Sequence, residues 1–227
     1  MTYVTNLMLL QSPVTITSYN GYHPNYPSKT LVRLASMTPI AVPSPVPTLV
    51  GDNLCLRPPQ PTDITDRQRI GRNSEFRRMV GAAEPNDAPM TNADAEKWYD
   101  LLCNQPYTWM IEWQGRAIGH ARLHQLDTAN RRARYAIGIF DPTCWDQGLG
   151  TEATVLVLGY AFNMLNLHRV DLRVLAYNQR AIRAYTKAGF VQEGIEREGA
   201  WIAGRWESDV WMSILEHEYH ARYATPG

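Results

Sequence analysis

Hydrophobic and polar residues alternate in several segments of the chain with the period of two that is typical of β-strands. Other segments repeat apolar residues at helical spacing, such as Val155, Leu158, Phe162 and Leu165. These patterns predict strands over 54–58, 107–114, 116–126, 133–140, 170–176, 190–198 and 207–215, and helices over 62–80, 89–102, 151–165 and 179–188. Their order predicts an α/β (α+β) fold: one mixed, largely antiparallel central sheet flanked by helices.

Local signals sharpen several of these boundaries. Thr91 and Asp94 have the spacing of a capping box at a helix start. Gln114-Gly115 lies between two predicted strands, which indicates a short hairpin turn. Gly189 follows a predicted helix and suits the left-handed position that ends many helices.

The front of the chain differs from the rest. Ten of the fifteen prolines lie in residues 1–61, and proline at this density predicts an extended linker over 38–50. We therefore divide the chain into a proline-rich N-terminal extension (1–52), a folded domain (53–218) and a C-terminal tail (219–227). Three interpretations of the extension remain open: a loosely ordered or strap-like segment without catalytic importance, a translation start at Met37, and a targeting peptide.

Composition narrows the function classes. The chain has 22 basic and 22 acidic residues, and zero net charge argues against a protein whose main role is to coat nucleic acid. No apolar run reaches the ~18 residues that span a bilayer. Cys55, Cys103 and Cys144 form no CxxC pair, so we expect a cytoplasmic protein with reduced thiols and no metal site.

A glycine-bearing loop, CWDQGLGTEA at 144–153, connects a predicted strand to a predicted helix. Gly148 and Gly150 let the backbone approach a ligand closely, and the start of the helix offers unpaired N–H groups. This arrangement suits an anion such as a pyrophosphate, although a plain turn with a helix cap has the same pattern. Neither the Walker motif nor the dinucleotide GxGxxG motif is present.

Together with NQRAIRAYTKAGF at 178–190, this loop resembles the GNAT superfamily of acyl-CoA N-acyltransferases. The family's pyrophosphate loop is Q/R-x-x-G-x-G/A, and the chain departs from it with Trp145 at the first position. That tryptophan, Thr151-Glu152 after the loop, and the segments 167–190 and 204–215 resemble the ribosomal-protein (Rim-type) N-acetyltransferase branch. The resemblance covers roughly 53–218.

The resemblance implies acetyl-CoA as cosubstrate and a primary amine, either a peptide N-terminus or a small molecule, as acceptor. It also implies homodimerisation as a family expectation. Three alternatives stay open: another acyl-CoA, an antibiotic amine as acceptor, or a non-catalytic module that senses coenzyme A.

The resemblance also assigns roles to individual residues. The backbone of 138–140 would pair with the pantetheine arm where the strand diverges from its neighbour, 145–151 would hold the pyrophosphate, and Arg180 would reach the phosphates. Asn178 and Tyr185 would be the catalytic pair, contacting pantetheine and protonating the coenzyme A thiolate. The implied site residues are Gly138, Ile139, Phe140, Trp145, Asp146, Gln147, Gly148, Leu149, Gly150, Thr151, Asn178, Arg180 and Tyr185.

The chemistry of Tyr185 is consistent with that role. It lies seven residues after Asn178, so the two side chains share one side of a helix. A phenol with a pKa near 10 can donate a proton to a thiolate whose conjugate acid has a pKa of about 8.5. A packing tyrosine is the alternative interpretation.

The sequence names no clear general base. Arg134 and Arg173 occupy positions where relatives carry a glutamate, which leaves Asp171, His120 and a water relay as alternatives. The last predicted hairpin is rich in acidic residues and also carries two tryptophans. These acids could form a rim that attracts a cationic amine, or they could belong to a solvated turn without a functional role. Its residues of interest are Glu193, Glu196, Glu198, Trp201, Trp206, Glu207 and Asp209.

Overall fold

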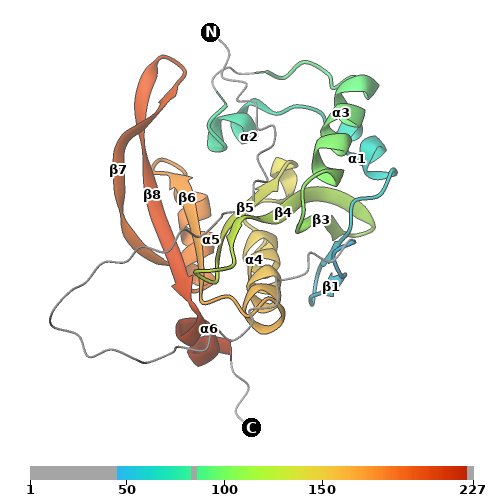
Figure 1. The fold of residues 1–227 in the computed structure, drawn as a ribbon. Coiled ribbons are helices and arrows are strands. Elements are labelled where there is room, and N and C mark those ends of the chain that lie inside the picture. The colour runs from blue at the N-terminus through green and yellow to red at the C-terminus, as the bar shows by residue number, and fades with distance from the viewer. Residues whose placement is uncertain (1–44, 83–85, 224–227) are drawn as a thin grey trace, which may run out of the picture. The chain divides into compact units, whose positions relative to one another are not determined.

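A computed structural model describes residues 45–82 and 86–223. Their centre is one eight-stranded sheet in the order β1-β2-β3-β4-β5-β6-β8-β7, antiparallel except for the β5–β6 pair (Figure 1). The strands are β1 (Leu49–Val50), β2 (Cys55–Arg57), β3 (Thr108–Trp113), β4 (Arg116–Asp127), β5 (Arg132–Ile139), β6 (Arg169–Leu175), β7 (Val191–Ile202) and β8 (Arg205–Leu215). The predicted fold class is confirmed.

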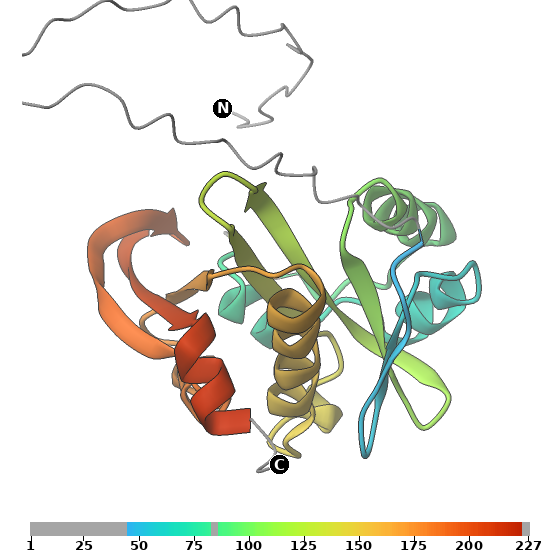
Figure 2. The same ribbon diagram turned by 60° about the horizontal axis from the view of Figure 1, so that its bottom comes forward.

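Helices flank both faces of the sheet. They are α1 (Asp63–Ile70), α2 (Ser74–Met79), α3 (Asn92–Cys103), α4 (Leu149–Gly159, continued by a π-turn over Tyr160–Met164), α5 (Gln179–Lys187) and α6 (Glu216–Tyr223). Helices α4 and α6 lie side by side on one face (Figure 2). On the other face, Leu102 and Trp98 of α3 pack against Met110 and Ala117.

The main core lies between the sheet and the α4–α6 face. Trp109, Ile118 and Leu123 are fully buried there, and Val157 and Leu158 of α4 pack into the same cluster. Full burial of such side chains contributes about 1.5–3 kcal/mol each to folding.

Turn chemistry matches the sequence predictions closely. Gln114 and Gly115 both have positive φ, as a tight hairpin between β3 and β4 requires. Thr91 and Asp94 form the complete capping box of α3. Gly189 has a φ of 98° after α5, so the predicted left-handed helix end is also confirmed.

The predicted helix over 62–80 is wrong as a single element. Gly71, at φ 70°, ends α1, and Asn73 restarts the chain as the cap of α2 by accepting from the backbone N–H of Phe76. The turn at 71–73 gives α1 and α2 different directions (Figure 1). Both helices can therefore contribute side chains to one site.

Two boundaries of the folded domain also need correction. Leu49 and Val50 pair with β2, and the Trp109 indole donates to the Pro47 carbonyl, so the domain begins within the predicted linker. At the other end, α6 replaces most of the predicted tail and buries Tyr219 against Phe162. Predictions for residues 1–44 lie outside the described residues.

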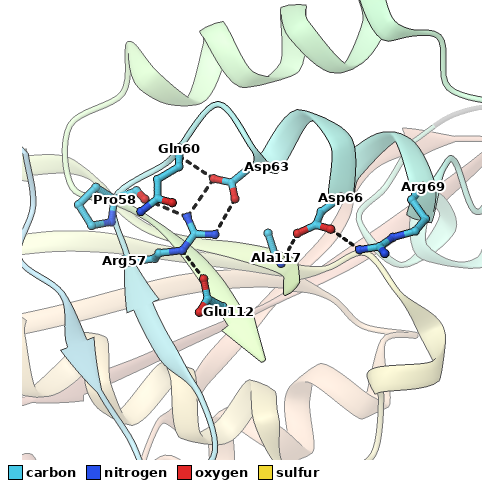
Figure 3. Close-up of polar contacts among 8 residues, drawn as sticks. All are labelled: Arg57, Pro58, Gln60, Asp63, Asp66, Arg69, Glu112 and Ala117. Carbon is cyan, nitrogen blue, oxygen red and sulfur yellow. Dashed lines mark hydrogen bonds and ion pairs between the residues drawn. The ribbon is translucent and has the colours of Figure 1, made fainter. Parts of the chain in front are cut away.

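A buried ion cluster attaches α1 to the sheet (Figure 3). The guanidinium of Arg57 donates to both carboxylate oxygens of Asp63, at 2.7 and 3.1 Å, and to Glu112 at 2.5 Å. Asp63 also accepts from the backbone N–H of Gln60. Farther along α1, Asp66 accepts from the backbone N–H of Ala117 at 2.8 Å, which fixes the helix against β4.

The one parallel pair of the sheet is short. Strands β5 and β6 pair only from Arg132↔Arg169 to Arg134↔Asp171, and β5 continues to Ile139 paired with β4 alone. From Tyr135 onward, the β6-facing edge of β5 has no strand partner in the described sheet. This divergence is what the family resemblance implies for the strand before the glycine loop. In the described ranges, no helix is long and apolar enough to cross a membrane.

Candidate acetyl-CoA and acceptor site

A cavity of about 860 Å³ opens where β5 and β6 diverge. It is lined from both faces of β5, since Tyr135 and Ile137 point to one face and Ala136 and Gly138 to the other. All of the predicted site residues line this cavity except Gln147, whose side chain is exposed and donates to the Thr143 carbonyl at 2.7 Å. The fold therefore brings together segments from 138–151 and 178–185.

The start of α4 forms one end of the cavity. Gly148 caps the helix at φ 82° with no side-chain hydrogen bond to the helix N–H groups. A Cβ at Gly148 would meet nothing within 4 Å, so the residue is required for its backbone conformation. The helix start faces the cavity with free donors and the positive end of its dipole, which fits a pyrophosphate.

Arg180 reaches this loop from α5. Its Nε lies 3.2 Å from both carboxylate oxygens of Asp146, and its guanidinium stacks 4.3 Å from the Trp145 ring centroid. The Trp145 indole in turn donates to the Ile139 carbonyl at 3.0 Å. These contacts hold Arg180 beside the α4 start, where its charge suits a phosphate.

The side chain of Asn178 forms hydrogen bonds with two helices. Its Oδ1 accepts from the Ala181 backbone N–H at 3.1 Å, capping α5, and its Nδ2 donates to the Met79 carbonyl at 3.1 Å. The side chain thus connects the end of α2 to the start of α5. A contact between Asn178 and pantetheine stays a prediction.

Tyr185 is buried on the cavity-facing side of α5 and is 8% exposed. The centroid of its ring lies 6.3 Å from that of Tyr135 in an edge-on contact and 5.8 Å from that of Phe190 in a tilted one. Burial raises the pKa of the Tyr185 phenol above its ordinary value. The hydroxyl is protonated at physiological pH, as an ordinary phenol is, and the raised pKa makes it a weaker acid until a thiolate develops beside it.

Among the described residues, four of the five acids of the predicted rim pair with arginines, and Glu198 is exposed. Arg169 of β6 binds Glu193 through two contacts of 2.6 Å, and Arg173 contacts both Glu196 and Asp209. Glu207 pairs with Arg205. The register of β6 with β8 places Arg169 and Arg173 against these acids, a contact that sequence spacing does not reveal.

The structure distinguishes between the two side chains that the sequence offers as general base. Asp171 pairs with Arg134 at 2.9 Å and Arg169 at 3.5 Å and is absent from the cavity lining, which argues against a role as base. His120 lines the cavity, but burial and the charges of Arg122 and Arg67 lower its pKa to about 4. Such an imidazole is a weak proton acceptor.

Two carboxylates line the cavity: Asp146, which pairs with Arg180, and Asp209. Asp209 is 4% exposed, and its Oδ2 is buried without a hydrogen-bond donor among the described residues, 3.4 Å from the Arg173 Nε. Burial raises the pKa of Asp209 above its ordinary value, against the lowering effect of Arg173. From the sequence alone, Asp209 is one of several acidic residues of the hairpin, and nothing distinguishes it as a candidate base.

Several cavity residues belong to α1–α3 and could not be predicted from the sequence. Arg67, Phe76 and Trp98 line the cavity beside Phe140. No motif marks them, and only the break between α1 and α2 brings Arg67 and Phe76 to the same place.

Comparison with known proteins identifies the class. Residues 53–191 match the family model described as an acetyltransferase (GNAT) domain. Spermidine N(1)-acetyltransferase of Escherichia coli is 34% identical over 174 residues, covering 76% of this chain and 91% of that protein. A putative ribosomal N-acetyltransferase of Bacillus subtilis is 31% identical over 179 residues, covering 75% and 95%.

Solved structures agree with this assignment. Spermidine N-acetyltransferase from Vibrio cholerae in complex with CoA and spermine superposes with a TM-score of 0.62 at 25% identity, covering 74% of this chain and 99% of that one. A GNAT-family acetyltransferase from Bacillus anthracis, at 18% identity and a TM-score of 0.65, shares the fold. The chain belongs to the GNAT acetyltransferase family. It is an N-acetyltransferase whose cosubstrate is acetyl-CoA.

Proposed function

We propose that the chain transfers an acetyl group from acetyl-CoA to a primary amine by direct attack, with Tyr185 as the general acid. The observation that carries this proposal is the cavity between β5 and β6, which joins the α4 start, the open edge of β5 and the buried Tyr185 phenol. Backbone groups of 138–140 would hold pantetheine, and the α4 start with Arg180 would hold the pyrophosphate.

The reaction makes one bond and breaks one. The neutral amine attacks the thioester carbonyl, the new C–N bond forms, and the C–S bond breaks. The leaving thiolate takes the proton of the Tyr185 hydroxyl, which lacks a hydrogen-bond partner among the described residues. The amine loses a proton to a base or to water.

We propose Asp209 as that proton acceptor. It is buried and lines the cavity, and its Oδ2, 3.4 Å from the Arg173 Nε, accepts no hydrogen bond from the described residues. A carboxyl with a raised pKa is a better base than an ordinary aspartate.

The Asp209→Asn substitution should lower kcat by about tenfold at pH 7. The effect is modest because about one α-amine in ten is already neutral at that pH and can react without a base. The wild-type pH profile should fall on the acidic side with an inflection above the ordinary aspartate pKa, since protonated Asp209 cannot act as a base. Glu198→Gln, an exposed carboxylate of the same hairpin, is the matched control; an equal effect in both variants would contradict the role.

The acceptor class has two candidates. A peptide N-terminus or small amine follows from the Rim-type resemblance and from the 31% identity to a putative ribosomal acetyltransferase. A polyamine is the second candidate, because a relative at 34% identity is a spermidine N(1)-acetyltransferase. Arginines pair with Glu193, Glu196 and Glu207 of the hairpin, which leaves few free carboxylates for a polycation and favours the first candidate.

Acetyl-CoA should stabilise the full-length protein. At 100 times its dissociation constant, a ligand adds about 2.7 kcal/mol to the free energy of unfolding, which raises the Tm of a protein of this size by about 5–10 °C. S-acetylpantetheine lacks the pyrophosphate and should give a smaller shift at equal concentration. Thermal unfolding measures both; equal shifts would contradict the pyrophosphate site, and no shift with acetyl-CoA would contradict the cosubstrate site.

Coenzyme A release in the presence of an amine panel tests the transfer itself. Turnover that depends on both acetyl-CoA and an amine supports the proposal. Binding of acetyl-CoA without turnover on peptides, small amines or polyamines would instead support a sensor of coenzyme A.

A further inference from the structure

Two arginines, one buried and one half-buried, lie at the part of the cavity formed by α1 and β4. Arg67 is 9% exposed, and Arg122 is half-buried. In the part of the chain that the structure describes, neither forms an ion pair with an acidic side chain. Arg67 donates to the Gly71 carbonyl and Arg122 to the Gln105 side chain, while the Nε of each is buried without a partner.

Among the described residues, no acidic side chain pairs with either arginine at this end of the cavity. His120 lies near both arginines and carries no charge at neutral pH, because burial and the two guanidinium charges lower its pKa to about 4. Its Nδ1 is also buried without a partner. Burial lowers the pKa of Arg67 to about 10, so the guanidinium remains charged but is poorly solvated.

Aromatic rings hold Arg67 in place. Its guanidinium lies 4.7 Å from the Phe140 ring centroid and 5.8 Å from that of Trp98. Phe76 and Trp98 pack edge-on against Phe140 at 5.5 and 5.6 Å. This end of the cavity therefore combines fixed positive charge with apolar rings.

We propose that Arg67 and Arg122 bind a carboxylate of the acceptor, so the acceptor is a primary amine that carries a carboxylate on the same molecule. The inference rests on the proposed acetyl transfer and specifies its substrate class. A buried guanidinium with unused donors is costly, and a carboxylate matches its planar geometry. The phosphates of acetyl-CoA have other partners, namely the α4 start and Arg180.

The location suits an acceptor. His120 lies directly opposite Gly138 in the β4–β5 register, and Arg122 lies opposite Ala136. The anion-binding groups thus adjoin the stretch of β5 that would hold pantetheine. A polyamine would place additional positive charge beside two arginines, which disfavours it.

The test compares binding of two acetylated products to the full-length protein in the presence of coenzyme A. N-acetylphenylalanine and N-acetylphenylalaninamide differ only in the carboxylate, and neither has an amine whose pKa could bias the comparison. Titration calorimetry should show the acid binding at least about tenfold more tightly, because a charged hydrogen bond contributes that much or more. Arg67→Gln and Arg122→Gln should each reduce that preference to threefold or less.

Arg69→Gln is the matched control, because Arg69 lies on the same helix, is exposed and pairs with Asp66 outside the cavity. It should retain the preference for the acid. Equal binding of acid and amide, no binding of the acid, or a preference unchanged in both cavity variants would overturn the inference. Preference for the acid without acetyl transfer to any amine would overturn the proposed function alone; transfer without the preference would overturn the carboxylate site alone.

Discussion

Tyr185→Phe should lower kcat by about 10²-fold or more while acetyl-CoA binding changes little. The substitution removes only the hydroxyl, and the ring keeps its contacts with Tyr135 and Phe190. Loss of a general acid at a thiolate leaving group costs a factor of this size. Because burial raises the pKa of Tyr185, wild-type kcat should show no loss from phenol ionisation up to the ordinary tyrosine value near 10.

Steady-state kinetics and acetyl-CoA titration of the same preparations separate the two effects. Tyr219→Phe is the matched control: it is a buried tyrosine of α6 that packs on Phe162, outside the cavity lining. It should leave kcat within about twofold. Unchanged turnover in Tyr185→Phe would remove Tyr185 from the mechanism, and weaker acetyl-CoA binding with unchanged kcat would make it a binding residue.

Local chemistry explains why so much of the fold could be predicted. The capping box of Thr91 and Asp94 and the Gln114-Gly115 turn are settled within a few residues of sequence, and the structure confirms both. The glycine loop is also local, and its link to Tyr185 came from the family resemblance. What failed was the helix over 62–80, because the local preference of Gly71 and Asn73 for a break lies inside an otherwise helical pattern.

The acceptor end of the site could not be predicted because tertiary structure creates it. Strand register places Arg169 and Arg173 against the hairpin acids and leaves Asp209 at the cavity. Arg67 reaches Phe140 only because α1 is fixed against β2 and β4. Sequence spacing carries no information on such contacts between distant segments.

The ion cluster that fixes α1 leads to the second prediction with a large effect (Figure 3). Asp63→Asn should lower the free energy of unfolding by about 3 kcal/mol or more, because it removes one partner of a buried ion pair and leaves charge uncompensated. Asp63 is fully buried and accepts three hydrogen bonds, two of them from Arg57. For a protein of this size, the Tm should fall by roughly 6–12 °C.

Chemical denaturation measures the change. Asp100→Asn on α3 is the control: Asp100 is exposed, so this substitution should change the free energy of unfolding by less than about 0.5 kcal/mol. Glu112 also pairs with Arg57 and limits the loss in Asp63→Asn. A double substitution of Arg57 and Asp63 by apolar residues of similar volume should therefore recover part of the stability, since it leaves no unpaired buried guanidinium. If Asp63→Asn proves as stable as the control, the cluster does not fix α1, and the position of Arg67 in the cavity must depend on its aromatic contacts instead.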